Sequence, residues 1–215
     1  MDYGRKGAGK RKEMLTSKSL SARRKATTLW LLILLVLVIG GIGYAGYRVY
    51  GYVKNTIENG PDISSIDATP SGYMSTVYDA SGNVSAQLVG TGSNRVYATL
   101  DEIPKNLQYA FVAIEDERFY EHNGIDIKGI IRAGMQGITS GSFSEGASTI
   151  TQQLLKNNVF DGWTSETSAE RVQRKIQEQY LAIELEKEVS KDWIMENYLN
   201  TINLGQNTLG VQAAS

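Results

Sequence analysis

The sequence predicts a mostly α-helical domain behind a single N-terminal transmembrane helix, with a short β-hairpin between the two. Residues 26–47 contain no charged side chain and are mainly apolar, as a membrane-spanning helix requires. Residues 73–89 alternate weakly between polar and apolar side chains around a loop that contains Gly82, which is typical of a hairpin. From residue 100 onward, apolar side chains recur with the period of an α-helix.

The composition limits the chemistry of the chain. Its 215 residues include no Cys and a single His, His122. Disulfides, thiolate nucleophiles, zinc sites built on Cys and multi-His metal sites are therefore excluded. If the chain is an enzyme, its acid–base chemistry must use carboxylates, Lys, Tyr or this one His.

Positive charge is concentrated before and at the start of the apolar run. Residues 1–28 contain nine Lys or Arg and two acids, whereas the rest of the chain contains 13 and 21. As a helix, residues 26–47 would be about 33 Å long, enough to cross a bilayer core of ~30 Å. The positive-inside rule predicts that residues 1–25 lie in the cytoplasm and that the chain after Arg48 is extracytoplasmic. The basic tail itself is expected to be disordered, beside anionic lipid. A cleaved signal peptide is the alternative, but the long charged leader favours an uncleaved anchor in the cell membrane.

Residues 48–99 are predicted to form a stalk and the hairpin. Gly, Pro, Ser, Asn and Asp dominate residues 49–71 without a sustained period, which indicates a stalk. The two hairpin strands are expected at residues 75–78 and 84–89.

Residues 100–215 are predicted to form one domain of five helices. Asp101 and Asp126 are placed to cap the first two, with Pro104 in the first turn of the first helix. The first helix would bury one apolar face, formed by Leu107, Ala110, Phe111 and Ile114. The Gly- and Ser-rich residues 137–148 are expected to form a mobile loop after the second helix.

The remaining helices have clearer starting signals. Thr149 with Gln152, and Thr167 with Glu170, have the form of capping boxes. The helix that follows Thr167 should continue to about residue 188. Ser190 opens the last helix, which should end near Gly205.

An acidic cluster follows the first predicted helix directly, with the sequence EDERFYEHNG at residues 115–124. A buried helix that ends in Glu115 and Asp116 would bring a carboxylate to the edge of the core. Desolvation there raises a carboxyl pKa and produces a usable general base. The alternative is a solvated helix end, and for His122 a backbone hydrogen bond is preferred to a catalytic role.

A second cluster, EGASTITQQLLKN, occupies residues 145–157. Ser148 and Thr149 would place hydroxyl and free N–H groups at a helix N-terminus, which favours anions. Gln152, Gln153 and Lys156 lie within two turns of it. An ordinary capped helix is the alternative interpretation.

A third cluster, ERVQRKIQE, occupies residues 170–178. On a helix, one face would present Arg171, Arg174, Lys175 and Glu178. Three cations around one carboxylate suit a diphosphate and a group that acts on it. Salt pairing along the helix is the alternative, because such pairs form without any function.

Together with KDWIMENYLNTINLGQNTLGVQAAS, these clusters resemble in order and spacing the glycosyltransferase domain of class A penicillin-binding proteins and monofunctional peptidoglycan glycosyltransferases (glycosyltransferase family 51). The resemblance covers residues 100–215. It implies a lysozyme-like, mostly α-helical fold with a smaller lobe that dips into the membrane. It also implies an inverting hexosyltransferase that polymerises lipid II into β-1,4 glycan strands and releases undecaprenyl diphosphate. The implied partners are lipid II, the growing strand, the membrane and other cell-wall synthesis proteins, with no nucleic acid.

The resemblance further implies roles for individual residues. Glu115 matches the catalytic base that deprotonates the acceptor 4-hydroxyl group, and Glu178 matches a second essential glutamate near the donor diphosphate. Lys156, Arg174 and Lys175 match the cations that hold this diphosphate. The other substrate-binding positions are Asp116, Ser148, Thr149, Gln152 and Gln153. A divalent cation at the diphosphate is left open, and no other cofactor is implied.

The two glutamates are expected to differ in environment. Glu115, with few cations nearby, should have a raised pKa, and Glu178, beside Arg174 and Lys175, a lowered one. By analogy with inverting glycosidases, their carboxyl groups should lie more than ~6 Å apart across an open cleft.

The chain ends at Ser215, inside the family's domain, so we expect a fragment or truncated product, and activity of the fragment itself is not implied. Two other interpretations stay open: a lysozyme-like enzyme that cleaves glycan, and an inactive membrane-anchored scaffold. Three cations facing one glutamate favour a diphosphate leaving group, which hydrolysis does not need.

Overall fold

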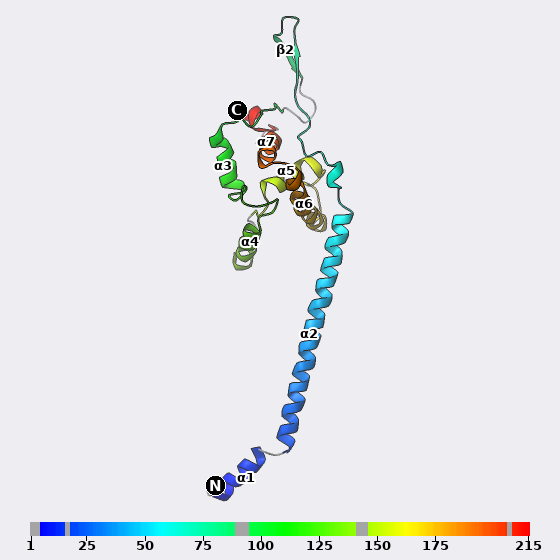
Figure 1. Cartoon of the computed structure of the whole chain (residues 1–215), viewed down its shortest axis with the longest axis vertical. Helices are drawn as coiled ribbons and strands as arrows, with labels where there is room; N and C mark the ends of the chain where they lie inside the picture. The colour runs from blue at the N-terminus through cyan, green and yellow to red at the C-terminus, as the bar shows by residue number, and fades with distance from the viewer. Residues whose placement is uncertain (1–4, 16–17, 89–94, 141–145, 206–207) are drawn as a thin grey trace. The chain divides into compact units, whose positions relative to one another are not determined.

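The structure, a computed structural model, describes residues 5–15, 18–88, 95–140, 146–205 and 208–215 (Figure 1). The chain divides into two units, Met1–Asn55 and Thr56–Ser215. The described residues are mostly helical, with one two-stranded antiparallel sheet. This confirms the coarse architecture that the sequence predicts.

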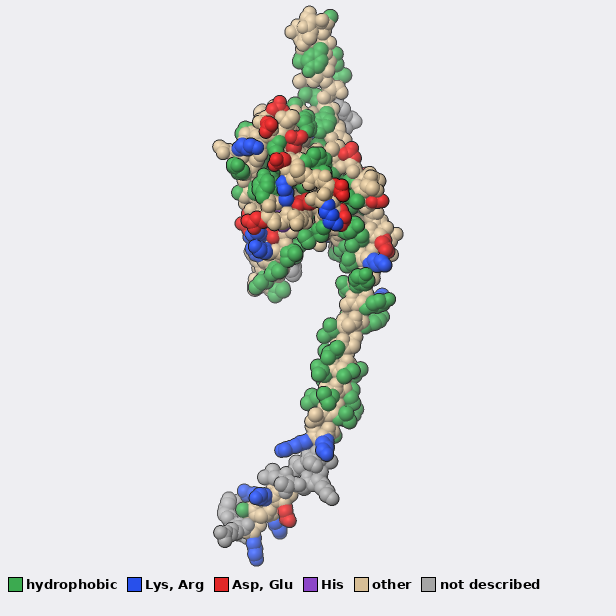
Figure 2. Space-filling model, in the orientation of Figure 1, with side chains coloured by type: hydrophobic (Ala, Val, Ile, Leu, Met, Phe, Trp, Pro, Cys, Tyr) green, Lys and Arg blue, Asp and Glu red, His purple; other side chains and the backbone are tan. Residues whose placement is uncertain are grey.

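The first unit contains helix α1 (Arg5–Leu15) and most of helix α2 (Lys18–Glu58). Among the described residues, one helix is long and apolar enough to cross a membrane, and its hydrophobic side chains from Leu29 to Tyr52 are exposed (Figure 2). Two expectations are wrong here. The basic tail is helical over α1, and α2 continues through residues 48–58 instead of giving way to a stalk. The first proline after the apolar run is Pro61, so nothing before it forces the helix to end.

The hairpin consists of β1 (Ser75–Tyr78) and β2 (Val84–Leu88), as predicted. The strands pair antiparallel, with Ser75 opposite Leu88. The turn is fixed by Asp79, whose carboxylate accepts hydrogen bonds from the backbone N–H groups of Ser81 (2.8 Å) and Asn83 (2.9 Å). Such an Asx-type turn explains why a short polar sequence reverses the chain here.

The other regular elements described in the second unit are helices. After a short 3₁₀ helix (Ile63–Ser65), it contains α3 (Lys105–Glu115), α4 (Ile127–Ser140), α5 (Ile150–Val159), α6 (Ser168–Glu188), α7 (Lys191–Thr201) and α8 (Val211–Ala214). Helix α5 packs against both α6 and α7. The buried apolar side chains come mainly from these three helices and include Ile150, Leu154, Leu155, Leu181, Ala182, Ile194, Met195, Tyr198 and Leu199.

The predicted caps of the last three long helices are present. Thr149 and Thr167 each form a complete capping box, with Gln152 and Glu170 respectively. The Ser190 hydroxyl accepts the backbone N–H of Trp193 at the start of α7. These local signals confirm that the starts of α5, α6 and α7 are encoded in the sequence.

The predictions for α3 and α4 are partly wrong. Helix α3 begins after Pro104 without a side-chain cap, so Asp101 lies in the preceding turn. The expected buried stripe is mostly exposed: Ile114 is 80% exposed and Phe111 is only partly buried against the core, whereas the polar Gln108 is buried. Helix α4 continues to Ser140, into the expected loop, of which residues 141–145 lie outside the described residues.

Helix α4 keeps an exposed apolar face, formed by Ile127, Ile131, Met135 and Ile138. A helical repeat of apolar residues predicts an amphipathic helix but does not say what covers its apolar face. Periodicity reports that a helix is amphipathic, and burial depends on which other element reaches it.

Gly124 connects the acidic cluster to α6. Its φ is +86°, and a Cβ atom there would lie 2.4 Å from the carbonyl oxygen of Ala182 in α6. Gly82 in the hairpin turn has a similar φ of +84°, but a Cβ atom there would meet nothing within 4 Å.

We predict that Gly124→Ala lowers the free energy of unfolding by about 2–5 kcal/mol, because left-handed backbone strain and overpacking add. Gly82→Ala is the matched control and should cost only about 1–2 kcal/mol from backbone strain. Urea unfolding of both variants measures the difference. Equal losses of unfolding free energy in the two variants would show that α6 makes room for the added methyl group without loss of stability.

Candidate active site

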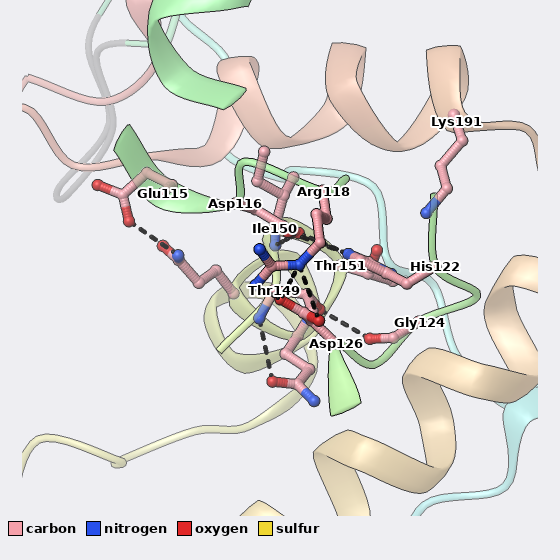
Figure 3. Close-up of polar contacts among 12 residues, drawn as sticks. Glu115, Asp116, Arg118, His122, Gly124, Asp126, Thr149, Ile150, Thr151 and Lys191 are labelled. Atoms are coloured by element: carbon pink, nitrogen blue, oxygen red, sulfur yellow. Dashed lines mark hydrogen bonds and ion pairs between the residues drawn. The ribbon is translucent and has the colours of Figure 1, made fainter. Parts of the chain in front are cut away.

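The first part of the site joins the end of α3 to the start of α5 (Figure 3). Asp116, directly after α3, is buried, and its carboxylate accepts the backbone N–H of Ile150 at 3.0 Å. The same carboxylate contacts His122 Nε2 at 2.9 Å. The Thr149 hydroxyl donates to the carbonyl oxygen of Gly124 at 2.7 Å. A carboxylate at a helix N-terminus satisfies an otherwise unpaired N–H group and complements the helix dipole.

Glu115 is the last residue of α3, and its carboxylate accepts a hydrogen bond from the Gln153 side-chain amide at 2.9 Å (Figure 3). The expectation that Glu115 ends a buried helix is wrong, because Glu115 is exposed. The Tyr198 hydroxyl lies 3.4 Å from Gln153 Oε1, so Gln153 connects Glu115 to the core.

A cavity of about 150 Å³ lies beside Glu115. Its lining includes residues from both of the first two clusters: Glu115, Asp116, Gly146, Ala147, Ser148 and Thr149. The structure therefore confirms that these two parts of the sequence meet. Their small residues leave space for a ligand next to an exposed carboxylate.

The second part of the site is an ion cluster on α6. Glu178 is fully buried, and its two carboxylate oxygens are bound separately by Arg174 and by Lys175, the latter at 2.7 Å. Lys175 also donates to the Ser148 hydroxyl at 2.8 Å. Because a buried carboxylate needs compensating charge, Glu178 fixes both cations on its own helix face. Ser148 links this cluster to the cavity beside Glu115.

Charged groups from both parts of the site influence Lys156 on α5. Burial lowers its pKa from the usual 10.5, and nearby Lys175 lowers it further. Glu178 and Glu115 act in the opposite direction, so both carboxylates lie near enough to influence this ammonium group. Its Nζ lies 4.2 Å from the Trp163 ring centroid, a cation–π contact.

The predicted residues take different positions in this arrangement. Gln152 serves the cap of α5, because its side-chain oxygen accepts the Thr149 backbone N–H at 3.1 Å. Asp116 and Thr149 are buried in the connection described above. The remaining predicted residues surround the cavity or the ion cluster: Glu115, Ser148, Gln153, Lys156, Arg174, Lys175 and Glu178.

Several residues near the site had no predicted role. Arg118 pairs with Asp126 (2.6 Å) and with Glu117, and lines the same cavity. Trp163 and Glu166, from the segment between α5 and α6, contact Lys156 and Arg174. The sequence shows their residue types, but apart from Glu117 their partners are seven or eight residues away, beyond the i, i+3 and i, i+4 spacings of one helix face.

Among the described residues, no group of three or more His, Asp or Glu side chains is arranged to hold a metal ion. Glu178 is already paired with two cations. The donor set therefore does not form a metal site by itself, and a divalent cation at a bound diphosphate stays untested.

Comparisons with known proteins identify the family of the chain. A family model described as Transglycosylase matches residues 81–215, more than half of the chain. Penicillin-binding protein 1A of Clostridium perfringens (strain 13 / Type A) is 47% identical over 179 residues, which cover 81% of this chain and 25% of the relative. Penicillin-binding protein 1A of Escherichia coli (strain K12) is 38% identical over 192 residues, 89% of this chain and 21% of the relative.

The chain thus spans a quarter or less of the length of these relatives. The matched region contains all three clusters that form the site. Through residues 81–215, this chain belongs to the transglycosylase family, glycosyltransferase family 51.

Proposed function

We propose that the chain provides a peptidoglycan glycosyltransferase activity, which polymerises lipid II into β-1,4 glycan strands and releases undecaprenyl diphosphate in cell-wall synthesis. One observation supports this most strongly. Ser148 lines the cavity beside the exposed Glu115 and accepts a hydrogen bond from Lys175, which together with Arg174 binds the buried Glu178. A base and a concentration of positive charge therefore lie in one site, as transfer from a diphosphate donor requires.

Glu115 is the proposed general base. Its carboxylate is exposed and lies beside the 150 Å³ cavity, while Gln153 holds one of its oxygens. An acceptor 4-hydroxyl group in the cavity would give its proton to Glu115 as its oxygen attacks the donor anomeric carbon. The bond from that carbon to the diphosphate then breaks, and the negative charge leaves with the diphosphate.

The positive cluster is proposed to stabilise this departing charge. Lys156, Arg174 and Lys175 supply three positive charges around Glu178. Charge that develops on the diphosphate oxygens is stabilised when cations are already oriented toward it. Glycan hydrolysis has no such leaving group, so this cluster favours synthesis over cleavage.

The finer aspects of the assignment are also proposals. A single displacement by the acceptor hydroxyl would invert the anomeric centre, with the acceptor sugar between Glu115 and Glu178. The family resemblance supports a lysozyme-like fold for the domain. The exposed apolar face of α4 suits a lobe that dips into lipid, near a lipid-linked substrate. Helix α2 is proposed to anchor the protein in the cell membrane, with residues 1–25 in the cytoplasm.

The first test concerns the base. Glu115→Gln should reduce lipid II polymerisation by about 10²–10⁴-fold, because the amide keeps the size of the side chain but cannot accept the proton. Polymerisation is measured by gel analysis of glycan products from labelled lipid II. Glu121→Gln, an exposed change in the same acidic cluster, should retain wild-type activity. Activity of Glu115→Gln within a few-fold of wild type would remove Glu115 from the mechanism.

The second test uses the pKa of Lys156. Because this pKa is lowered from 10.5, Lys156 loses its proton at a lower pH than an ordinary lysine. Affinity for undecaprenyl diphosphate should therefore decline with rising pH before pH 10.5 is reached. Lys156→Arg should abolish this decline, since a guanidinium stays protonated throughout the range.

Titration of inhibition by undecaprenyl diphosphate against pH measures this effect. Lys128→Arg, at an exposed position on α4, is the control and should keep the wild-type pH profile. The assignment fails if the Lys156→Arg profile matches that of the wild type.

The third test concerns orientation. Protease added to intact spheroplasts should digest the chain after Arg48 and spare residues 1–25, because the basic leader is expected to stay in the cytoplasm. Permeabilised cells provide the control, in which both parts should be digested. Protection of the C-terminal domain in intact spheroplasts would contradict the proposed location.

A further inference from the structure

Arg174 is held by two carboxylates at once. Its Nε donates to Glu166 at 2.7 Å and its Nη2 binds the other oxygen of the same carboxylate. Its Nη1 binds Glu178. The Arg174 side chain is only 9% exposed. All three guanidinium nitrogens are therefore engaged, and one edge of the guanidinium forms the bidentate pair that is typical of strong arginine–carboxylate contacts.

Lys175 differs from Arg174 in its access to ligands. Its side chain is 38% exposed, and of its three possible donors the ammonium uses two, toward Ser148 and Glu178. Arg174 instead points its donors at carboxylates that are almost fully buried, because Glu166 is 9% exposed and Glu178 is 0% exposed. A diphosphate can thus approach Lys175 more directly than it can approach Arg174.

The local sequence fixes Glu166 in this position. Glu166 directly precedes Thr167, which caps α6 through the capping box with Glu170. This cap sets the path by which the chain enters the helix, so the Glu166 side chain lies along the first two turns. It meets Arg174 eight residues later and also Arg171, whose Nε lies 3.3 Å away. The contact with Arg174 holds the pKa of Glu166 below its usual range.

The negative charge of Glu166 changes what Arg174 can bind. Without Glu166, an anion that entered the site could compete with Glu178 for Arg174. With Glu166 bound to one edge, the guanidinium is neutralised locally and its remaining edge is directed at Glu178. Glu178 is then held between Arg174 and Lys175 in one orientation.

We propose that Glu166 is a positioning residue of the glycosyl-transfer site: it holds Arg174 so that Arg174 orients Glu178, and the diphosphate is contacted by Lys156 and Lys175. This inference rests on the proposed glycosyltransferase function and deepens it. It assigns a role to a residue outside the three sequence clusters. It also gives Arg174 an indirect role in place of direct contact with the leaving group.

The experiment is a double-mutant cycle of Glu166→Gln and Arg174→Gln in the full chain, assayed for lipid II polymerisation. Each single change should lower kcat by about tenfold to a hundredfold, as expected for lost hydrogen bonds to charged groups. KM for lipid II and the inhibition constant of undecaprenyl diphosphate should stay within about threefold, since neither residue contacts the diphosphate. The double change should lose no more than either single change, because Glu166 acts through Arg174.

Two further variants calibrate the result. Lys156→Gln should raise the inhibition constant of undecaprenyl diphosphate by about tenfold or more, as expected for a direct contact. Glu170→Gln removes a nearby carboxylate and keeps a capping box, because Gln also serves at that position; it should leave kcat unchanged. If Arg174→Gln does not fold, Arg174→Lys replaces it, since Lys keeps the charge but cannot bind two carboxylates in this geometry.

The outcomes separate this inference from the proposed function. A wild-type chain that does not polymerise lipid II overturns the glycosyltransferase proposal. An active wild type whose Glu166→Gln variant keeps full kcat overturns the positioning role. Additive kcat losses in the cycle would also overturn the positioning role. So would an Arg174 variant that weakens the binding of undecaprenyl diphosphate as strongly as Lys156→Gln does, because Arg174 would then be a direct ligand.

Discussion

The buried carboxylate of Asp116 is the contact on which the site depends. It accepts the first backbone N–H of α5 and contacts His122, so it ties the end of α3 and the following loop to one helix terminus. Glu115, its neighbour, is thereby placed next to Gln153 on α5. Burying a carboxylate without hydrogen-bond partners costs free energy. The burial of Asp116 therefore favours the arrangement in which both partners are in place. The position of Glu115 beside the cavity therefore follows from a structural requirement.

Helix α6 carries a second buried carboxylate, and it is likewise held by its partners. Glu178 is fully buried, and its burial is possible only because Arg174 and Lys175 bind its two oxygens. Arg174 is in turn neutralised by Glu166. Lys175 is more exposed than Arg174, and the pKa of Lys156 is influenced by Lys175, Arg174 and both glutamates. The two glutamates differ because one is exposed and the other is enclosed by cations.

The sequence by itself determined the parts of this protein that depend on near neighbours. The capping boxes at Thr149 and Thr167, the Ser190 cap and the hairpin turn around Gly82 all involve residues within four positions of each other, and the structure has all of them. The three clusters also predicted a base, a helix terminus and a cation face. Their order and spacing were specific enough to indicate the family, which the comparisons confirm.

Only the tertiary structure decided which faces are buried and which charges meet. The period of α3 predicted a buried stripe, yet Ile114 is 80% exposed, because amphipathicity does not specify what packs against a helix. Likewise, i, i+4 spacing placed Arg174 beside Glu178, but it could not show that Glu166 occupies the other edge of the guanidinium. Burial and ion pairing depend on where the segment between α5 and α6 returns in space. That path is set by packing over the whole domain, which a local pattern does not contain.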